Sequence, residues 1–256
     1  MTSKEKVLEL LESNKASYTS GEAMALALGL SRNAVWKAIN ELRKAGYSID
    51  AVSNRGYRLA GGNDIISAAG IIAEMADAPA DLLERIHVFD NVDSTNKVAK
   101  EMAISGSPNG TLIIAKTQGC GKAHKQNSFQ SPEGGIYMSV ILTPENLSIE
   151  NASSITAQVG QKVCDAISCC CAVTPTIQPI NNLYVDDKKV CGILTESGQE
   201  FDSGLIQWLV IGIGIYFDID SAALPDNVGS LFKPGKATVS KNALIAKIYS
   251  ELLDWN

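Results

Sequence analysis

A lysine in a predicted β-hairpin is the residue of this chain best placed to bind an anion. Residues 183–185 are predicted to form a short strand, residues 186–188 a polar turn, and residues 190–195 an apolar strand. Lys189 lies between the turn and the second strand, and Gly192 in that strand lets another group approach the backbone. The pattern predicts that Lys189 neutralises a negatively charged ligand group.

Two further segments have the composition of ligand-binding sites. Residues 93–96, with the sequence D-S-T-N, begin a predicted helix, where unpaired backbone N–H groups and short polar side chains can hold a polar ligand. Residues 117–134 join two predicted strands and contain glycines and cations, as in loops that wrap a phosphate. The alternatives that the residues leave open are an ordinary helix cap and a solvated loop.

Three helices are predicted before residue 47. Apolar residues recur in each at helical spacing, and Gly29 and Gly46 end the second and third helices. Capping residues mark the three starts: Thr2 with Glu5, Thr19 with Glu22, and Ser31. This is the spacing of a helix-turn-helix.

Two short strands, at residues 47–52 and 56–59, predict a wing beside the third helix. Residues 1–60 have nine lysines and arginines against six acidic residues, a net charge of +3 that suits a polyanion, whereas the remainder has −9. We therefore predict DNA binding; the alternative is a solvated helix face with a packed Trp36. The candidate DNA-contacting residues are Ser31, Arg32, Asn33, Trp36, Lys37, Asn40 and Arg55.

A linker helix is predicted at residues 61–80, capped by Asn63 or Asp64 and ended by Pro79. Residues 81–256 then alternate between strand-like and helix-like segments. Strands outnumber helices and several are neighbours in sequence, which favours an α+β domain with a mixed sheet. The predicted strands lie at residues 86–89, 111–116, 135–143 and 208–215, besides the hairpin, and the predicted helices lie after Asp93, at 152–170 and after Ser240.

Composition excludes several classes of protein. The 256 residues are 45% hydrophobic and 20% charged, enough for one large core and a small accessory domain. The six cysteines lack the paired spacing of a zinc site, and with only two histidines a histidine-rich metal centre is excluded. No apolar run is long enough to span a bilayer and no signal peptide precedes the first helix, so we expect a cytoplasmic protein without a membrane partner.

The chain resembles the bifunctional biotin protein ligases, which also repress the biotin operon. The hairpin with Lys189 and the D-S-T-N segment match theirs, and the loop matches their G-R-G-R-x-G-R and S-P pattern at Gln118, Gly121, Ser131 and Pro132. The resemblance covers residues 1 to 256. It implies an N-terminal winged helix-turn-helix at 1–60, a linker helix at 61–80, and a mixed-sheet biotin/lipoate ligase-like domain at 81–256, without the family's carboxy-terminal SH3-like domain.

The resemblance also implies roles for particular residues. Lys189 would touch the biotin carboxylate and the activated phosphate, and is the implied catalytic residue. The implied biotin-binding residues are Ser94, Thr95, Asn96, Gln118, Lys122, Ala123, His124 and Lys189. The implied phosphate and nucleotide residues are Gly121, Lys122, Lys125 and Asn181. A protein-bound metal is not among the implied groups.

In this family, the biotin carboxylate attacks the α-phosphate of ATP, which carries Mg²⁺. The resulting biotinyl-AMP is then attacked by a lysine of the biotin carboxyl carrier protein of acetyl-CoA carboxylase. The resemblance thus implies biotin and ATP as substrates, the carrier protein and operator DNA as partners, and a homodimer.

The chain also departs from the family pattern. The family's loop arginines fall on Lys122, His124 and Asn127, its K-W-P-N-D segment is replaced at residues 178–182, and Tyr216 stands where asparagine is usual. A lysine or histidine cannot reproduce the bidentate fork of arginine. These departures leave an alternative open: a ligand-sensing transcriptional regulator that uses the same pocket with impaired or no ligase activity.

Overall fold

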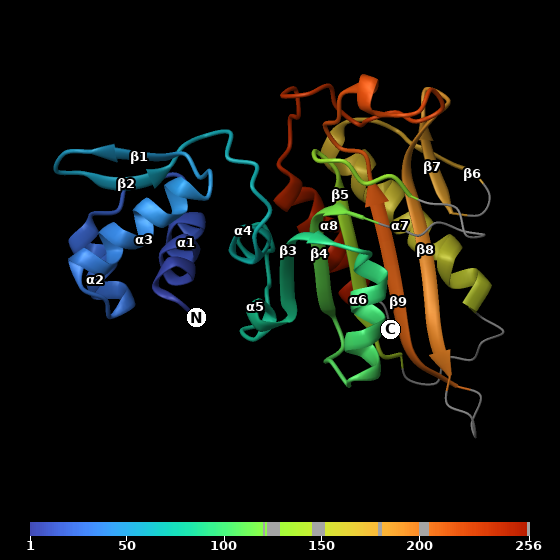
Figure 1. The fold of residues 1–256 in the computed structure, drawn as a ribbon, viewed down its shortest axis with the longest axis horizontal. Helices are drawn as coiled ribbons and strands as arrows, with labels where there is room; N and C mark the ends of the chain where they lie inside the picture. Colours follow the sequence, from blue (N-terminus) through green and yellow to red (C-terminus); the bar gives the residue numbers. More distant parts are fainter. Residues whose placement is uncertain (120, 122–128, 145–151, 179–180, 200–204, 255–256) are drawn as a thin grey trace. The chain divides into compact units, whose positions relative to one another are not determined.

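The chain divides into two compact units, Met1–Ala78 and Pro79–Asn256. The computed structural model describes residues 1–119, 121, 129–144, 152–178, 181–199 and 205–254. Figure 1 follows the chain through both units. The predicted linker, residues 61–80, falls almost wholly within the first unit, because the division comes after it.

The first unit is a winged helix. It contains the helices α1 (Ser3–Ser13), α2 (Gly21–Leu28) and α3 (Arg32–Lys44), followed by the antiparallel strands β1 (Ile49–Val52) and β2 (Gly56–Leu59). The predicted capping box of Thr2 and Glu5 is present, and the Ser31 side chain caps α3. Gly29 ends α2 with a φ of 63°, a left-handed conformation that glycine adopts without strain.

The predicted cap of α2 is wrong by one residue. Ser20 caps this helix, accepting the backbone N–H of Ala23, whereas Thr19 does not. The backbone of Thr19 is engaged instead with Tyr57 of β2, through two N–H to O hydrogen bonds of 2.9 Å. Because this pairing holds Thr19 in the extended chain, the helix begins after Ser20.

The linker helix is also shorter than predicted. α4 spans Ala68–Ala73 and is capped by Ser67, not by Asn63 or Asp64. The Asn63 side chain is bonded elsewhere, accepting the N–H of Ser48 at 2.7 Å and donating to its carbonyl at 2.8 Å. A side chain fixed in this way is not free to cap a helix.

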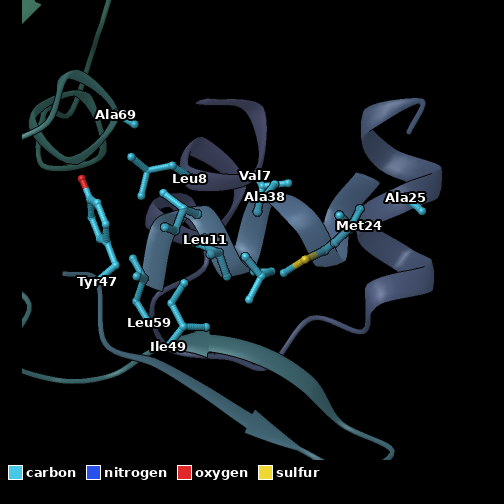
Figure 2. Close-up of a cluster of buried hydrophobic side chains, with 13 residues drawn as sticks. Val7, Leu8, Leu11, Met24, Ala25, Ala38, Tyr47, Ile49, Leu59 and Ala69 are labelled. Carbon is cyan, nitrogen blue, oxygen red and sulfur yellow. The ribbon is translucent and has the colours of Figure 1, made fainter. Parts of the chain in front are cut away.

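One apolar core holds the first unit together. Figure 2 shows side chains from α1, α2, α3 and both strands packed against one another, with the hydroxyl of Tyr47 directed toward α4 and Ala69. α4 therefore packs on the winged helix. The labelled members of this core are Val7, Leu8, Leu11, Met24, Ala25, Ala38, Tyr47, Ile49, Leu59 and Ala69.

The second unit is built on a seven-stranded sheet. Among the strand pairs of the described residues, β3–β4 is parallel and the others are antiparallel, which confirms the predicted mixed α+β sheet. The predicted strands and the hairpin are all present, and the short β6 was not predicted. In spatial order the strands are β3 (Ile86–Val92), β4 (Thr111–Gln118), β5 (Ile136–Leu142), β9 (Ile206–Ile215), β8 (Lys188–Gln199), β7 (Asn182–Val185) and β6 (Thr176–Gln178).

Helices cover both faces of this sheet. α6 (Thr95–Ile104) lies on one face, and α7 (Ala152–Cys171) and α8 (Lys241–Leu253) lie on the other (Figure 1). The shorter helices α5 (Leu82–Arg85) and η3 (Ser221–Ala223) were not predicted. Among the helices in the described part of the chain, none has the length and apolar character needed to cross a bilayer.

Glycines mark the part of the sheet that lies near the start of α6. Gly214 of β9 is opposite Tyr137 of β5 on one side and Gly192 of β8 on the other, and Gly212 is opposite Ser139. Residues that face each other in a ladder share one face of the sheet, and so do alternate residues along a strand. This face therefore has three positions without side chains, which gives other groups room to approach the backbone.

Candidate functional site

The predicted residues Ser94, Thr95 and Gln118 come together where α6 begins. Ser94 caps the helix, as its side chain accepts the backbone N–H of Lys97 at 3.4 Å. The amide oxygen of Gln118, at the end of β4, accepts the backbone N–H of Thr95 at 2.8 Å and its hydroxyl at 3.2 Å. The helix cap is thus part of the polar cluster. An ordinary helix cap and a ligand-binding segment, the two alternatives for residues 93–96, therefore do not exclude each other.

Asn96 extends this cluster into the sheet. Its amide oxygen accepts the Ser139 hydroxyl at 2.7 Å, and its nitrogen donates to the Glu196 carboxylate at 2.9 Å. Glu196 in turn accepts Nζ of Lys100 at 3.0 Å. A Cβ on Gly212 would lie 2.0 Å from the Asn96 amide oxygen, so this close approach requires glycine. Asn96 is 5% exposed and is bonded through both amide atoms, which fixes α6 to the sheet.

An aromatic side chain lies on the other two glycines. A Cβ on Gly192 or Gly214 would come within 2.9 or 2.4 Å of the Phe129 ring. The ring stacks on Tyr216, with centroids 5.0 Å apart and planes 12° from parallel. Phe129 is 9% exposed and packs in a small cluster that also includes Tyr137. We call Gly192 and Gly214 the glycine floor; in this structure the Phe129 ring covers it.

Lys189 lies beside the same ring. Its Nζ is 5.3 Å from the Phe129 centroid and would be 3.2 Å from a Cβ on Gly192. The side chain is half-buried, and this burial lowers the pKa of the ammonium because the charged form loses hydration. Among the described residues, no carboxylate forms an ion pair with it. A half-buried cation of this kind can be stabilised by a ligand anion.

An open cavity of about 410 Å³ has Phe129 in its lining, together with several residues predicted from the loop. Its wall is held by the hydrogen bond from Nε2 of Gln118 to the Ser131 hydroxyl, at 2.8 Å. Gly121 accepts the N–H of Phe129 at 2.6 Å, and a Cβ there would lie 2.3 Å from the Phe129 carbonyl oxygen. The lining residues are Gln118, Gly119, Gly121, Phe129, Gln130, Ser131, Pro132 and Ala223.

The remaining predicted ligand-site residues are placed as follows. Asn181 lies beside β8, where its side chain donates to the Ile193 carbonyl at 2.6 Å and its own carbonyl accepts the Ile193 N–H. The side chain thus joins the start of β7 to β8, the other strand of the hairpin. Lys122, Ala123, His124 and Lys125 lie outside the described residues.

Sequence reasoning did not include three residues that the structure brings to the site. In the sequence, Phe129 is an aromatic residue of the loop, and Tyr216 replaces the family's usual asparagine after β9. Neither feature indicates that the two rings stack on each other. Ser139 is fully buried in β5, and its hydroxyl oxygen also lies within hydrogen-bonding distance of the Thr95 hydroxyl, at 2.8 Å. No local pattern marked it, because its role depends on partners more than forty residues away in sequence.

The predicted DNA-contacting residues lie on and beside α3. Trp36 is 56% exposed, which rules out the alternative of a packed tryptophan. An open depression of about 610 Å³ runs along the helix, lined by Trp36, Lys37, Asn40, Glu41, Arg43 and Lys44. Arg32 and Asn33 are exposed at the start of the helix, where Ser31 serves as its cap. Arg55 is exposed in the turn of the wing.

Comparisons with known proteins agree with this arrangement. Residues 3–58 match a helix-turn-helix domain, and residues 88–215 match the biotin/lipoate A/B protein ligase family. The bifunctional ligase/repressor BirA of Bacillus spizizenii is 33% identical over 232 residues, which cover 89% of this chain and 69% of that protein. The protein of the same name from Escherichia coli is 28% identical over 212 residues, or 82% of this chain and 62% of that one.

Solved structures show the same fold. A biotin protein ligase from Aquifex aeolicus in complex with biotin and ATP aligns with a TM-score of 0.53 at 25% identity, over 66% of this chain and 69% of that chain. A biotin protein ligase from Leishmania major in complex with biotin aligns with a TM-score of 0.55 at 20% identity, over 69% and 74% of the two chains. The chain therefore belongs to the biotin/lipoate A/B protein ligase family, among its bifunctional ligase/repressor members that carry a helix-turn-helix domain.

Proposed function

We propose that this protein activates biotin with ATP, transfers it to a biotin carboxyl carrier protein, and represses transcription by binding operator DNA. The observation that carries the ligase half is Lys189, a half-buried cation beside the glycine floor with no ion-pair partner among the described residues. A ligand carboxylate would supply the missing charge. The names of the curated relatives and the biotin-bound neighbours support biotin as that ligand.

The reaction would proceed in two steps. The biotin carboxylate attacks the α-phosphorus of ATP and displaces pyrophosphate, which gives biotinyl-AMP. The amine of a carrier-protein lysine then attacks the activated carbonyl, loses a proton, and releases AMP. Lys189 would neutralise the carboxylate as it approaches the phosphate, because a fixed cation in a water-poor site stabilises such charge effectively. Mg²⁺ would accompany ATP.

The polar cluster would supply the other end of the pocket. Thr95 is bonded to Gln118, and Ser139 links Thr95 to Asn96. Few of these hydrogen-bonding groups therefore have to be reordered when a ligand arrives. A ligand with a polar cyclic amide could bond to the remaining lone pairs and protons of this cluster. Biotin, which has a ureido group at one end and a carboxylate at the other, fits the two kinds of group.

Ligand entry would require a local movement. The Phe129 ring covers both glycines of the floor and lies beside Lys189, so the ring and a ligand cannot occupy this space together. We propose that biotin displaces the ring from the glycine floor. The displaced ring could then pack against the ligand, since aromatic side chains gain from such contacts.

The repressor half would use the exposed face of α3 and the wing. Arg32, Asn33, Trp36, Lys37 and Asn40 lie on or near this face and provide hydrogen-bonding and cationic groups of the kinds that read base edges and phosphates. Operator DNA bound symmetrically would require two copies of the chain, so we propose that the repressing form is a homodimer.

The decisive experiment measures AMP release and transfer of labelled biotin to a carrier domain. We expect AMP formation that depends on biotin, and label on the carrier at about 1 per second or faster. Biotin binding without AMP or labelled carrier would contradict the ligase proposal and would select the alternative of a ligand-sensing regulator. A gel-shift series with genomic fragments tests the repressor half separately.

A further inference from the structure

Charged and aromatic side chains form a stack in the wing of the first unit. Asp50 of β1 and Arg58 of β2 are partners in the ladder, and Nη2 of Arg58 donates to the Asp50 carboxylate at 2.9 Å. The same guanidinium lies over the ring of Tyr18, with its Cζ 4.6 Å from the centroid. Arg55, in the turn of the wing, lies over that ring at 4.5 Å. One tyrosine thus contacts two arginines.

Tyr18 reaches the wing from outside the hairpin. It precedes α2, and the next residue, Thr19, is bonded to Tyr57 through the backbone in both directions. Gly56 permits this contact, because a Cβ there would lie 2.1 Å from the Thr19 carbonyl oxygen. The backbone that carries the ring is therefore attached to the strand that carries Arg58.

The two arginines differ in what they can still bind. Arg58 already pairs with Asp50, whereas Arg55 is exposed and has no acidic partner among the described residues. A guanidinium stacked on a ring keeps its N–H donors free at its edge. The stack also restricts an otherwise flexible side chain, which lowers the entropy that Arg55 loses on binding an anion. Together Asp50, Arg55 and Arg58 carry one net positive charge, which matches one phosphodiester.

We propose that Tyr18 is a positioning residue that holds Arg55 for contact with a phosphate of duplex DNA. Arg58, fixed by Asp50, supports the ring from the strand. This inference rests on the proposed DNA binding and adds two residues, Tyr18 and Arg58, to the predicted interface. Its ligand is the DNA backbone, so the contact contributes affinity and register without reading sequence.

A double-mutant cycle tests the inference, using the full chain and a random-sequence DNA duplex over a range of salt concentrations. Loss of an exposed cation–π contact of about 0.5–1 kcal/mol predicts that Tyr18→Leu binds about two- to fivefold more weakly. Arg55→Ala should reduce the salt slope by about one. In the Arg55→Ala background, Tyr18→Leu should have no further effect, because the two residues act as a unit. Tyr18→Phe keeps the ring and should bind as the wild type does.

Two controls separate the possible failures. Lys236→Ala removes an exposed cation in the second unit and should leave both affinity and slope unchanged. Arg55→Lys retains the charge but not the planar group, and should lose affinity even if Tyr18→Leu fails to fold, as judged by thermal melting. Wild-type affinity for Arg55→Lys, or equal losses from Tyr18→Leu in both backgrounds, would overturn the positioning role. A wild-type chain that does not bind DNA at low salt would overturn the proposed repressor function itself.

Discussion

The two halves of the candidate pocket are built in opposite ways. In the polar half, Thr95, Asn96, Gln118 and Ser139 satisfy one another through hydrogen bonds of 2.7 to 3.2 Å. In the cationic half, Lys189 has no ion-pair partner among the described residues, and an aromatic ring covers the glycines beside it. One half is assembled before a ligand arrives, whereas the other half requires a ligand to be complete.

This difference separates stability from function within one site. A buried polar network whose members are hydrogen-bonded to one another stabilises the fold, and its members are costly to remove. A half-buried cation without an anion contributes little to stability and gains most when a ligand binds. Variants in the polar half should therefore change unfolding as well as binding, whereas variants in the cationic half should change mainly binding.

The largest effect is expected at Lys189. Lys189→Ala removes the charge that meets the ligand carboxylate, and hydrogen bonds to charged groups contribute about 1.5–3 kcal/mol, so biotin should bind about 10- to 150-fold more weakly. Isothermal titration measures this loss. Lys188→Ala, an exposed neighbour in the same hairpin, is the matched control and should bind normally. An unchanged titration curve for Lys189→Ala would remove this residue from the site.

The next effect is on folding and lies in the polar half. Asn96→Ala leaves the Ser139 hydroxyl and the Glu196 carboxylate short of a partner, which should lower the free energy of unfolding by about 1–3 kcal/mol. Urea titration would measure this change. The exposed Asn91, which donates to Thr117 at 2.7 Å, gives the control Asn91→Ala, expected to differ from the wild type by less than about 0.5 kcal/mol. Equal unfolding curves for the two variants would show that the network does not stabilise the fold.

A smaller effect is expected from Phe129. If the ring has to leave the glycine floor before biotin enters, Phe129→Ala should raise the association rate by about two- to tenfold, the range that loss of an aromatic pair of 0.5–1.5 kcal/mol allows. Stopped-flow binding measures this rate. Tyr216→Leu removes only the stacking partner and should give a smaller increase. Rates that stay at the wild-type value in both variants would mean that the ring does not obstruct entry.

The smallest effect is a dependence on pH. Burial lowers the pKa of Lys189, so the free protein loses this positive charge at a lower pH than an exposed lysine would. Biotin should bind with its full affinity at pH values below that pKa, and the affinity should fall as the pH rises through it. Lys189→Arg, whose side chain stays protonated, should abolish this alkaline fall. A fall that persists in Lys189→Arg would have to arise from another group.

The sequence predicts the cationic half of the site better than the aromatic residues that cover it. Lys189 and Gly192 lie in one hairpin, so a local pattern indicated both their strands and their proximity. The stacking of Phe129 on Tyr216 joins a loop to the end of β9, and depends on the order of strands in the sheet. The role of Ser139 cannot be predicted for the same reason, because a serine in an apolar strand gives no local indication of its hydrogen-bond partners.

Predictions of helix starts also fail where a residue contacts a distant part of the chain. Ser31 and the pair Thr2 and Glu5 cap helices as predicted, because capping depends on neighbours three residues away. Thr19 does not, because its backbone pairs with Tyr57, nearly forty residues further on. Local chemistry determines a cap unless a distant strand engages the same residue.

The most direct test is a crystal structure of the protein with biotin. We predict that the biotin carboxylate lies within about 3 Å of Nζ of Lys189, its usual hydrogen-bonding distance. The Phe129 ring should have left Gly192 and Gly214. Thr95 should keep its hydrogen bonds to Gln118 and Ser139, and Asn96 should keep its hydrogen bond to Ser139. Biotin bound elsewhere, or bound with the ring still on the glycine floor, would contradict the proposed site.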